Sequence, residues 1–202
     1  MSEMLDMPID WKELMAEDKV FGKKFYKFAP IFLQKHKKQN LPNYTYLGNF
    51  VPKEDLFQTP VDIESGLGPQ EKQKLEPIQL LKVGHYENDT PQGAWLREVH
   101  NLKFVNAKYH IQPCKMLIEN HMDENGVFTS KFKDGESFTT TQLKKIVHFL
   151  SDWQIGQAFM FSNECYMNWK KGDAISFPWY IEHATVNANK WHERHLLFIT
   201  GI

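Results

Sequence analysis

The feature that most constrains the fold is a run of short apolar segments, separated by turn residues, that begins at Ile78. Gly, Asp, Asn and Pro stand between most of these segments. Short strands divided by such turns are typical of a β-sandwich or a jelly roll. The predicted strands are Ile78–Val83, Trp95–Val99, Leu102–His110, Lys115–His121, Lys145–Ser151, Ala158–Ser162, Ala174–Phe177 and His195–Thr200.

The stretch from Met7 to Lys38 has a different pattern and is predicted to be helical. Three phenylalanines recur there at helical spacing, with lysines between them. Asp10 is the expected N-cap, and Glu13 follows it by three residues as in a capping box. We therefore expect residues 1–77 to form an N-terminal helical and loop region that packs on a core of residues 78–202, within a single domain.

The acidic stretch from Pro60 to Pro77 contains glycines and is predicted to be a loop or a short helix. A loop of this length beside a site can act as a lid. It can equally be a solvated connection, and the sequence favours neither interpretation.

Composition and charge exclude several classes of partner. The net charge is −1 over 202 residues, so there is no electrostatic case for a nucleic acid or an anionic membrane. No apolar run approaches the ~20 residues that span a bilayer, and the first residues lack the basic start and apolar stretch of a secretory signal. The two cysteines, Cys114 and Cys165, give no disulfide framework. A reducing, cytoplasmic location is the expectation.

Three residues have the chemistry of a metal site. His121 and Asp123 are two positions apart, so in a strand they project from the same face. His183, much further along the chain, is a candidate third ligand. Two His and one carboxylate with open positions suit a non-haem Fe(II) oxygenase. Arg194 follows His183 by 11 residues and is one of only two arginines in the chain.

This pattern resembles the Fe(II)/2-oxoglutarate-dependent dioxygenases, the family that includes prolyl hydroxylases and many small phage and bacterial oxygenases. The resemblance covers Tyr109 to the C-terminus. It includes the approach from Tyr109 to His121, and the segments Phe149–Gln157, Trp169–Asp173 and Phe177–Pro178. The departure is Cys114, where the family usually has Gly.

The resemblance implies a mainly β protein with N-terminal helices, built on a double-stranded β-helix (a cupin-like jelly roll). It implies Fe(II) bound by His121, Asp123 and His183, and 2-oxoglutarate whose 5-carboxylate pairs with Arg194. Dioxygen is the other substrate, ascorbate the accompanying reductant, and succinate and CO2 the co-products. Position 196 is Leu where many relatives have a second carboxylate donor, so Tyr109 is the candidate for that role. The hydroxylated substrate, a small molecule or a peptide, is not identified.

The resemblance also settles two local choices. Thr141–Leu150 fits a helical period moderately, but the family pattern favours a strand from about Lys145. His183 is expected on or just after a strand of the sheet opposite the one that contains His121.

A rival triplet, His85-Tyr86-Glu87, has no comparable partners downstream.

Two other functions stay open from the residues. One is a cupin-like metalloenzyme that does not use 2-oxoglutarate, although such sites typically have three or four His ligands. The other is a non-catalytic jelly-roll binding module, which has no need of an open-sided iron site.

Overall fold

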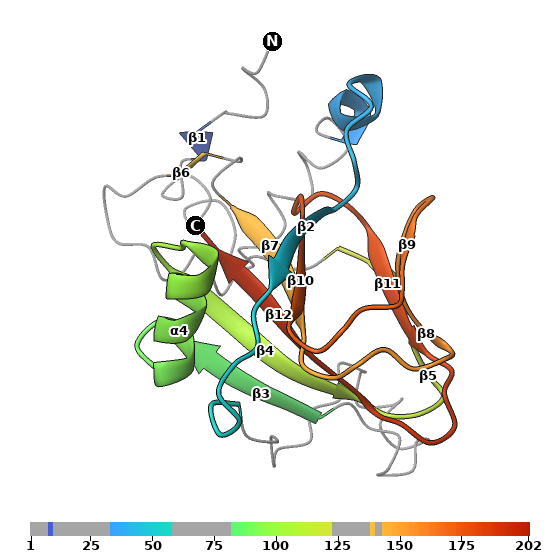
Figure 1. Ribbon diagram of the computed structural model, residues 1–202. Coiled ribbons are helices and arrows are strands. Elements are labelled where there is room, and N and C mark those ends of the chain that lie inside the picture. The colour runs from blue at the N-terminus through green and yellow to red at the C-terminus, as the bar shows by residue number, and fades with distance from the viewer. Residues whose placement is uncertain (1–7, 10–32, 58–81, 123–137, 140–142) are drawn as a thin grey trace, which may run out of the picture.

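A computed structural model gives the structure of the protein and describes residues 8–9, 33–57, 82–122, 138–139 and 143–202 (Figure 1). Most of the predicted helical stretch from Met7 to Lys38 and all of Pro60–Pro77 lie outside these residues. Residues 33–38 form a short helix. No helix in the described ranges is long and apolar enough to cross a membrane.

The larger of the two principal sheets has six antiparallel strands in the order β2-β10-β7-β12-β4-β3. Its strands are β2 (Thr45–Asn49), β3 (Lys82–Glu87), β4 (Val105–Gln112), β7 (Lys144–Phe149), β10 (Asp173–Phe177) and β12 (Arg194–Gly201). The edge strand β2 comes from the N-terminal region, so that region contributes directly to the sheet.

The smaller sheet has four antiparallel strands in the order β5-β11-β8-β9. These are β5 (Met116–His121), β8 (Gln157–Phe161), β9 (Cys165–Tyr166) and β11 (His183–Asn187). A separate two-stranded ladder pairs β1 (Pro8–Ile9) with β6 (Phe138–Thr139).

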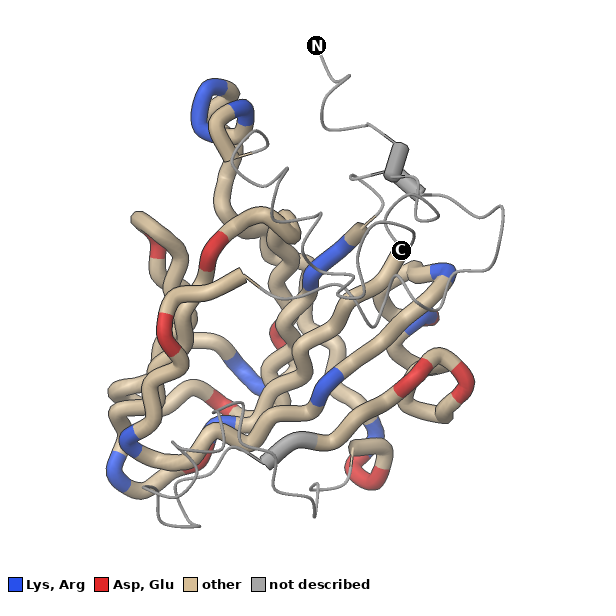
Figure 2. The backbone as a smooth tube through the Cα atoms, turned by 180° about the vertical axis from the view of Figure 1, so that it is seen from behind, with Lys and Arg blue, Asp and Glu red and all other residues tan. Residues whose placement is uncertain are grey.

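From β4 onward the chain passes repeatedly between the two principal sheets, which face one another (Figure 1). Strands β4, β7, β10 and β12 lie in the larger sheet, while β5, β8, β9 and β11 lie in the smaller one. This strand order is that of a double-stranded β-helix, so the predicted jelly-roll fold is confirmed. Acidic and basic residues are interspersed along the backbone (Figure 2), as the small net charge leads one to expect.

One predicted strand is wrong. Trp95–Val99 lies in α4 (Pro91–His100), the helix that covers the outer face of the larger sheet. Thr90 caps its start by accepting a hydrogen bond from the Gly93 amide, and Pro91 occupies the first turn. Asn101 ends the helix in the left-handed conformation.

The other predicted strands are found with shifted ends. Of the first of them, Ile78–Val83, residues 78–81 lie outside the described residues, and Lys82 and Val83 begin β3. The stretch that also fits a helical period forms the strand β7, as the family pattern predicts.

The core has two parts, one on each face of the larger sheet. Between the sheets lies a mainly aromatic cluster that includes Phe149, Phe159, Phe177 and Leu196. The outer cluster packs under α4. Because side chains alternate along a strand, consecutive residues of β12 contribute to different clusters.

Candidate functional site

His121 and His183 are cross-strand neighbours. His121 ends β5, His183 begins β11, and the two residues are directly paired in the antiparallel ladder. Their ring centroids are 4.6 Å apart. The expectation that His183 belongs to the opposite sheet is therefore wrong, because the strand order of the jelly roll places β11 next to β5 in the same sheet.

The third predicted ligand, Asp123, lies just outside the described residues, which break off after Met122. In the part of the chain that the structure describes, no group of three or more His, Cys, Asp or Glu is arranged to hold a metal ion. The rival triplet is not near this pair in the sheets, because His85 lies on the exposed edge strand β3 of the larger sheet.

Backbone carbonyls orient both imidazoles. Nδ1 of His121 lies 2.7 Å from the carbonyl oxygen of Glu119, and Nδ1 of His183 lies 3.4 Å from that of Ile181. When Nδ1–H donates to the carbonyl, the lone pair of the neutral ring is on Nε2. A metal-binding His is commonly held in this way through its other nitrogen. The pair therefore has the donor chemistry that a divalent transition metal requires.

Aromatic rings surround His183, which is fully buried. The Phe159 ring stacks on the imidazole with centroids 5.4 Å apart, and the Phe177 ring lies 4.8 Å away. Phe198 of the facing sheet is 6.1 Å away. These three rings limit the access of water to one side of the imidazole.

Arg194 is completely buried at the start of β12, on the face that points between the sheets. It shares that face with Leu196. One terminal nitrogen donates a 2.8 Å hydrogen bond to the carbonyl of Ala158, and the guanidinium carbon lies 5.9 Å from the centroid of a Trp169 ring. Burial lowers the pKa of Arg194 to about 9, so the side chain remains charged at neutral pH.

The ladder between β8 and β11 relates Arg194 to the histidine pair. Arg194 contacts the carbonyl of Ala158, and His183 pairs with Phe161, three residues further along β8. At ~3.3 Å per residue, Ala158 and Phe161 are therefore ~10 Å apart along β8. A metal bond, a five-carbon dicarboxylate and a charge-assisted hydrogen bond together span a distance of this size.

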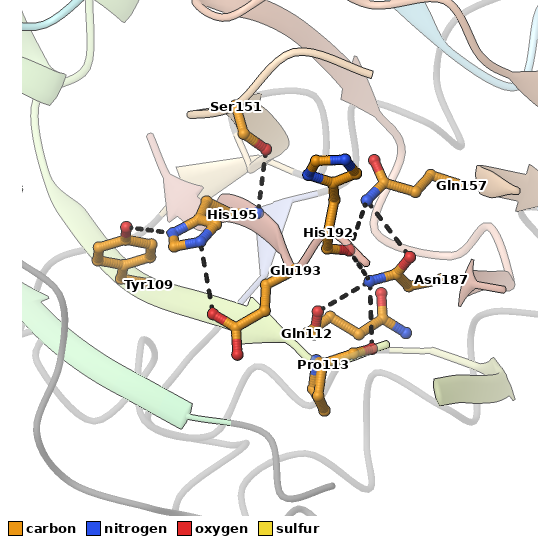
Figure 3. A network of polar contacts seen from close by, with 9 residues as sticks. All are labelled: Tyr109, Gln112, Pro113, Ser151, Gln157, Asn187, His192, Glu193 and His195. Carbon is orange, nitrogen blue, oxygen red and sulfur yellow. Dashed lines mark hydrogen bonds and ion pairs between the residues drawn. The ribbon is translucent and has the colours of Figure 1, made fainter. Parts of the chain in front are cut away.

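The assignment of Tyr109 as a carboxylate donor is wrong. Tyr109 is paired with Leu197, so both side chains point to the outer face of the larger sheet. Its hydroxyl lies 2.8 Å from Nδ1 of His195, as Figure 3 shows. The strand that carries Tyr109 does border the interior, but alternation turns this residue away from Arg194. The same register turns His195 to the outer face, away from Arg194.

The polar residues inside the barrel were not anticipated. Gln112, Thr185 and Asn187 are each buried. Nε2 of Gln112 donates to the carbonyl of Thr185, and Nδ2 of Asn187 donates to the carbonyls of Gln112 and Pro113 (Figure 3). Their spacing in the sequence could have indicated that Thr185 and Asn187 face the interior, because they follow His183 by two and four residues and so lie on the same face of the strand.

Comparisons with known proteins give structural similarities only. No family model matches the chain, and no curated protein matches its sequence. A prolyl-4-hydroxylase from Pseudomonas putida aligns with 82% of this chain and 95% of its own at 13% identity, with a TM-score of 0.49. An RmlC-like cupin from Shewanella frigidimarina aligns with 77% of this chain and 92% of its own at 11% identity, with a TM-score of 0.37.

A conserved protein of unknown function from Streptococcus pyogenes aligns over 48% of this chain at 14% identity, with a TM-score of 0.32, and this chain covers 63% of that protein. The fold assignment rests on the strand order of the two sheets and not on these similarities.

Proposed function

We propose that this protein is a non-haem Fe(II)- and 2-oxoglutarate-dependent oxygenase that hydroxylates its substrate with release of succinate and CO2. The observation that carries the proposal is the combination, inside one barrel, of two adjacent imidazoles and a buried guanidinium whose contact on β8, Ala158, lies three residues from the position paired with His183, or ~10 Å along the strand. Neither feature is needed by a jelly roll for its stability, and a buried unpaired cation is costly.

The donor set fits a ferrous ion. His121 and His183 would hold the metal through Nε2, and Asp123, two residues after His121 in the sequence, would supply the carboxylate. When bound, the iron would supply, together with 2-oxoglutarate and dioxygen, the oxidising power for hydroxylation. The carbonyls of Glu119 and Ile181 would orient the rings for this role.

Arg194 would hold the 5-carboxylate of 2-oxoglutarate. A planar guanidinium grips a carboxylate with two parallel hydrogen bonds. In the described part of the chain its Nε has no hydrogen-bond partner, and one terminal nitrogen is held by Ala158. This arrangement orients the group and leaves donors for an anion. A cupin-like enzyme without 2-oxoglutarate would have no use for such an anchor.

Phe159, Phe177 and Phe198 would keep water from the buried side of His183. A dry site strengthens electrostatic contacts and suppresses side reactions with solvent. The rings therefore favour the coupling of cosubstrate consumption to substrate oxidation.

The test combines binding and turnover. Calorimetric titration of 2-oxoglutarate into protein loaded with Fe(II) or Mn(II) should show one site, while metal-free protein should bind far more weakly. A screen of small molecules and peptides, with ascorbate present, should then identify substrates by succinate release. Failure of the metal-loaded protein to bind 2-oxoglutarate at millimolar concentration would exclude the proposal.

A further inference from the structure

A cleft opens at the end of the barrel opposite the histidine pair. His183 begins β11, whereas this cleft lies beyond the other end of that strand, where the connection to β12 meets the β4–β5 turn and the segment that follows β7. Its volume is about 810 Å³, within the range of ~300–1,000 Å³ that is typical of small-molecule sites. The lining residues are Pro113, Cys114, Lys115, Ser151, Lys190, Trp191, His192, Glu193 and His195.

Basic side chains dominate the cleft. Lys115, Lys190 and His192 all line it and are exposed. None of the three side chains has an acidic partner among the residues that the structure describes. The single carboxylate of the lining, Glu193, lies 3.8 Å from Nε2 of His195. The cleft therefore presents uncompensated positive charge, which favours an anionic ligand.

Trp191 stands at the edge of this cleft with 82% of its surface exposed. The loop that carries it is well ordered by hydrogen bonds. Oδ1 of Asn189 accepts from the amides of Trp191 and His192, at 2.7 and 2.8 Å, and Nδ2 of Asn187 donates to the carbonyl of His192 (Figure 3). Leaving an indole in water forgoes the burial of ~150–250 Å². A defined loop thus holds a large flat ring where a ligand ring can stack on it.

Two residues that line the cleft, Ser151 and His195, have side chains in polar contacts that orient them. The Tyr109 hydroxyl lies 2.8 Å from Nδ1 of His195 and holds that ring in place, and burial raises the pKa of Tyr109 to about 12, so the hydroxyl keeps its proton at neutral pH. The Ser151 hydroxyl oxygen accepts from the His195 amide at 3.2 Å, and its own proton is available to a ligand (Figure 3).

We infer that this cleft binds a planar aromatic anion, with its ring against Trp191 and its phosphate or carboxylate against Lys115, Lys190 and His192. The inference is independent of the proposed oxygenase activity, because Arg194, His121 and His183 are not among the residues that line the cleft. Phosphate and carboxylate compounds share the chemistry of recognition, so the experiment includes both.

The test is calorimetry on the full chain at low salt with four probes: adenosine monophosphate, indole-3-carboxylate, inorganic phosphate and adenosine. At least one of the two ring-bearing anions should bind, at least tenfold more tightly than both inorganic phosphate and adenosine. The tighter of the two identifies the anionic group that the cleft prefers. Trp191→Ala should weaken that ligand at least tenfold, and Lys190→Gln should do the same.

Lys38→Gln is the matched control, because Lys38 is an exposed lysine on the short helix 33–38 and is not among the residues that line the cleft. It should leave the affinity unchanged. Trp191→Ala should also leave 2-oxoglutarate binding to the metal-loaded protein unchanged, which separates this site from the proposed iron site. The inference is overturned if neither ring-bearing anion binds at millimolar concentration. It is also overturned if the affinity of the tighter anion for Trp191→Ala and for Lys190→Gln equals its affinity for the unmodified protein.

Discussion

Arg194 on β12 is joined to Ala158 on β8 by a hydrogen bond that crosses from one sheet of the barrel to the other. The terminal guanidinium nitrogen donates to the carbonyl oxygen over 2.8 Å. This contact fixes the direction of a fully buried cation, while its Nε lacks an acceptor among the described residues. The arrangement favours a bound anion as the missing partner of the charge.

Arg194→Ala should abolish tight binding of 2-oxoglutarate and leave iron binding intact. Removing one partner of a buried ion pair costs ~3–5 kcal/mol, so the affinity should fall more than a hundredfold. Arg194→Lys should recover part of it, because the charge survives while the planar fork is lost. Titration of 2-oxoglutarate into the Mn(II)-loaded variants measures both effects.

Arg97→Ala is the matched control, since Arg97 is the other arginine of the chain and lies on α4, outside the barrel. It should bind 2-oxoglutarate normally. An unchanged affinity in Arg194→Ala would show that the carboxylate anchor lies elsewhere.

Asp123→Ala should fold but bind iron weakly and release no succinate. The two imidazoles would remain, yet the facial arrangement needs the carboxylate as its third ligand. Metal content after equilibration with Fe(II) under anaerobic conditions measures the loss, and circular dichroism checks the fold. Asp55→Ala, at an exposed turn, is the control. Full iron occupancy in Asp123→Ala would contradict the ligand assignment.

The sequence predicted the fold well because its strands are short, apolar and separated by turn residues. It could not predict which sheet each strand joins. Their chemistry makes His121 and His183 joint candidates, and the structure brings them side by side, but their placement in one sheet follows from long-range strand order, which local patterns do not encode.

The other two errors have local physical causes. Trp95–Val99 is apolar enough for a strand, but Thr90 and Pro91 are strong signals for a helix start and decide the conformation. Tyr109 was chosen for its position in the family pattern. The side chain that faces the barrel is the neighbouring His110, because a shift of one residue along a strand exchanges the two faces.

Gly93→Ala should destabilise the protein, although Ala is normally favoured over Gly inside a helix by ~1 kcal/mol. A Cβ at Gly93 would lie 2.0 Å from the carbonyl oxygen of Glu87, a backbone atom that cannot move without disturbing β3 and the turn after it. Urea denaturation should show a lower free energy of unfolding. Glu98→Ala, at an exposed position of the same helix, should change it by less than ~0.5 kcal/mol. A stabilised Gly93→Ala would mean that the close approach of α4 to Glu87 is absent.

Acid should destabilise the protein through a buried histidine pair under α4. His100 of the helix and His148 of β7 have ring centroids 5.5 Å apart. Burial lowers the pKa of His100 to about 3 and that of His148 to about 4. In the unfolded chain both groups titrate near 6.5. Below pH 6.5 the unfolded state therefore binds more protons at these two histidines than the folded state does. The free energy of unfolding consequently falls as the pH drops towards 4.

Each histidine contributes a slope of up to ~1.4 kcal/mol per pH unit in this window. His100→Leu removes one of the two titrations, so its free energy of unfolding, measured in urea at pH 7, 6, 5 and 4.5, should decline less steeply than that of the unmodified protein. His85→Gln changes an exposed histidine on the edge strand β3 and should keep the original slope. Parallel pH profiles for His100→Leu and the unmodified protein would show that the His100 side chain takes up its proton in the folded state as it does in water, and that α4 does not seal this pair from solvent.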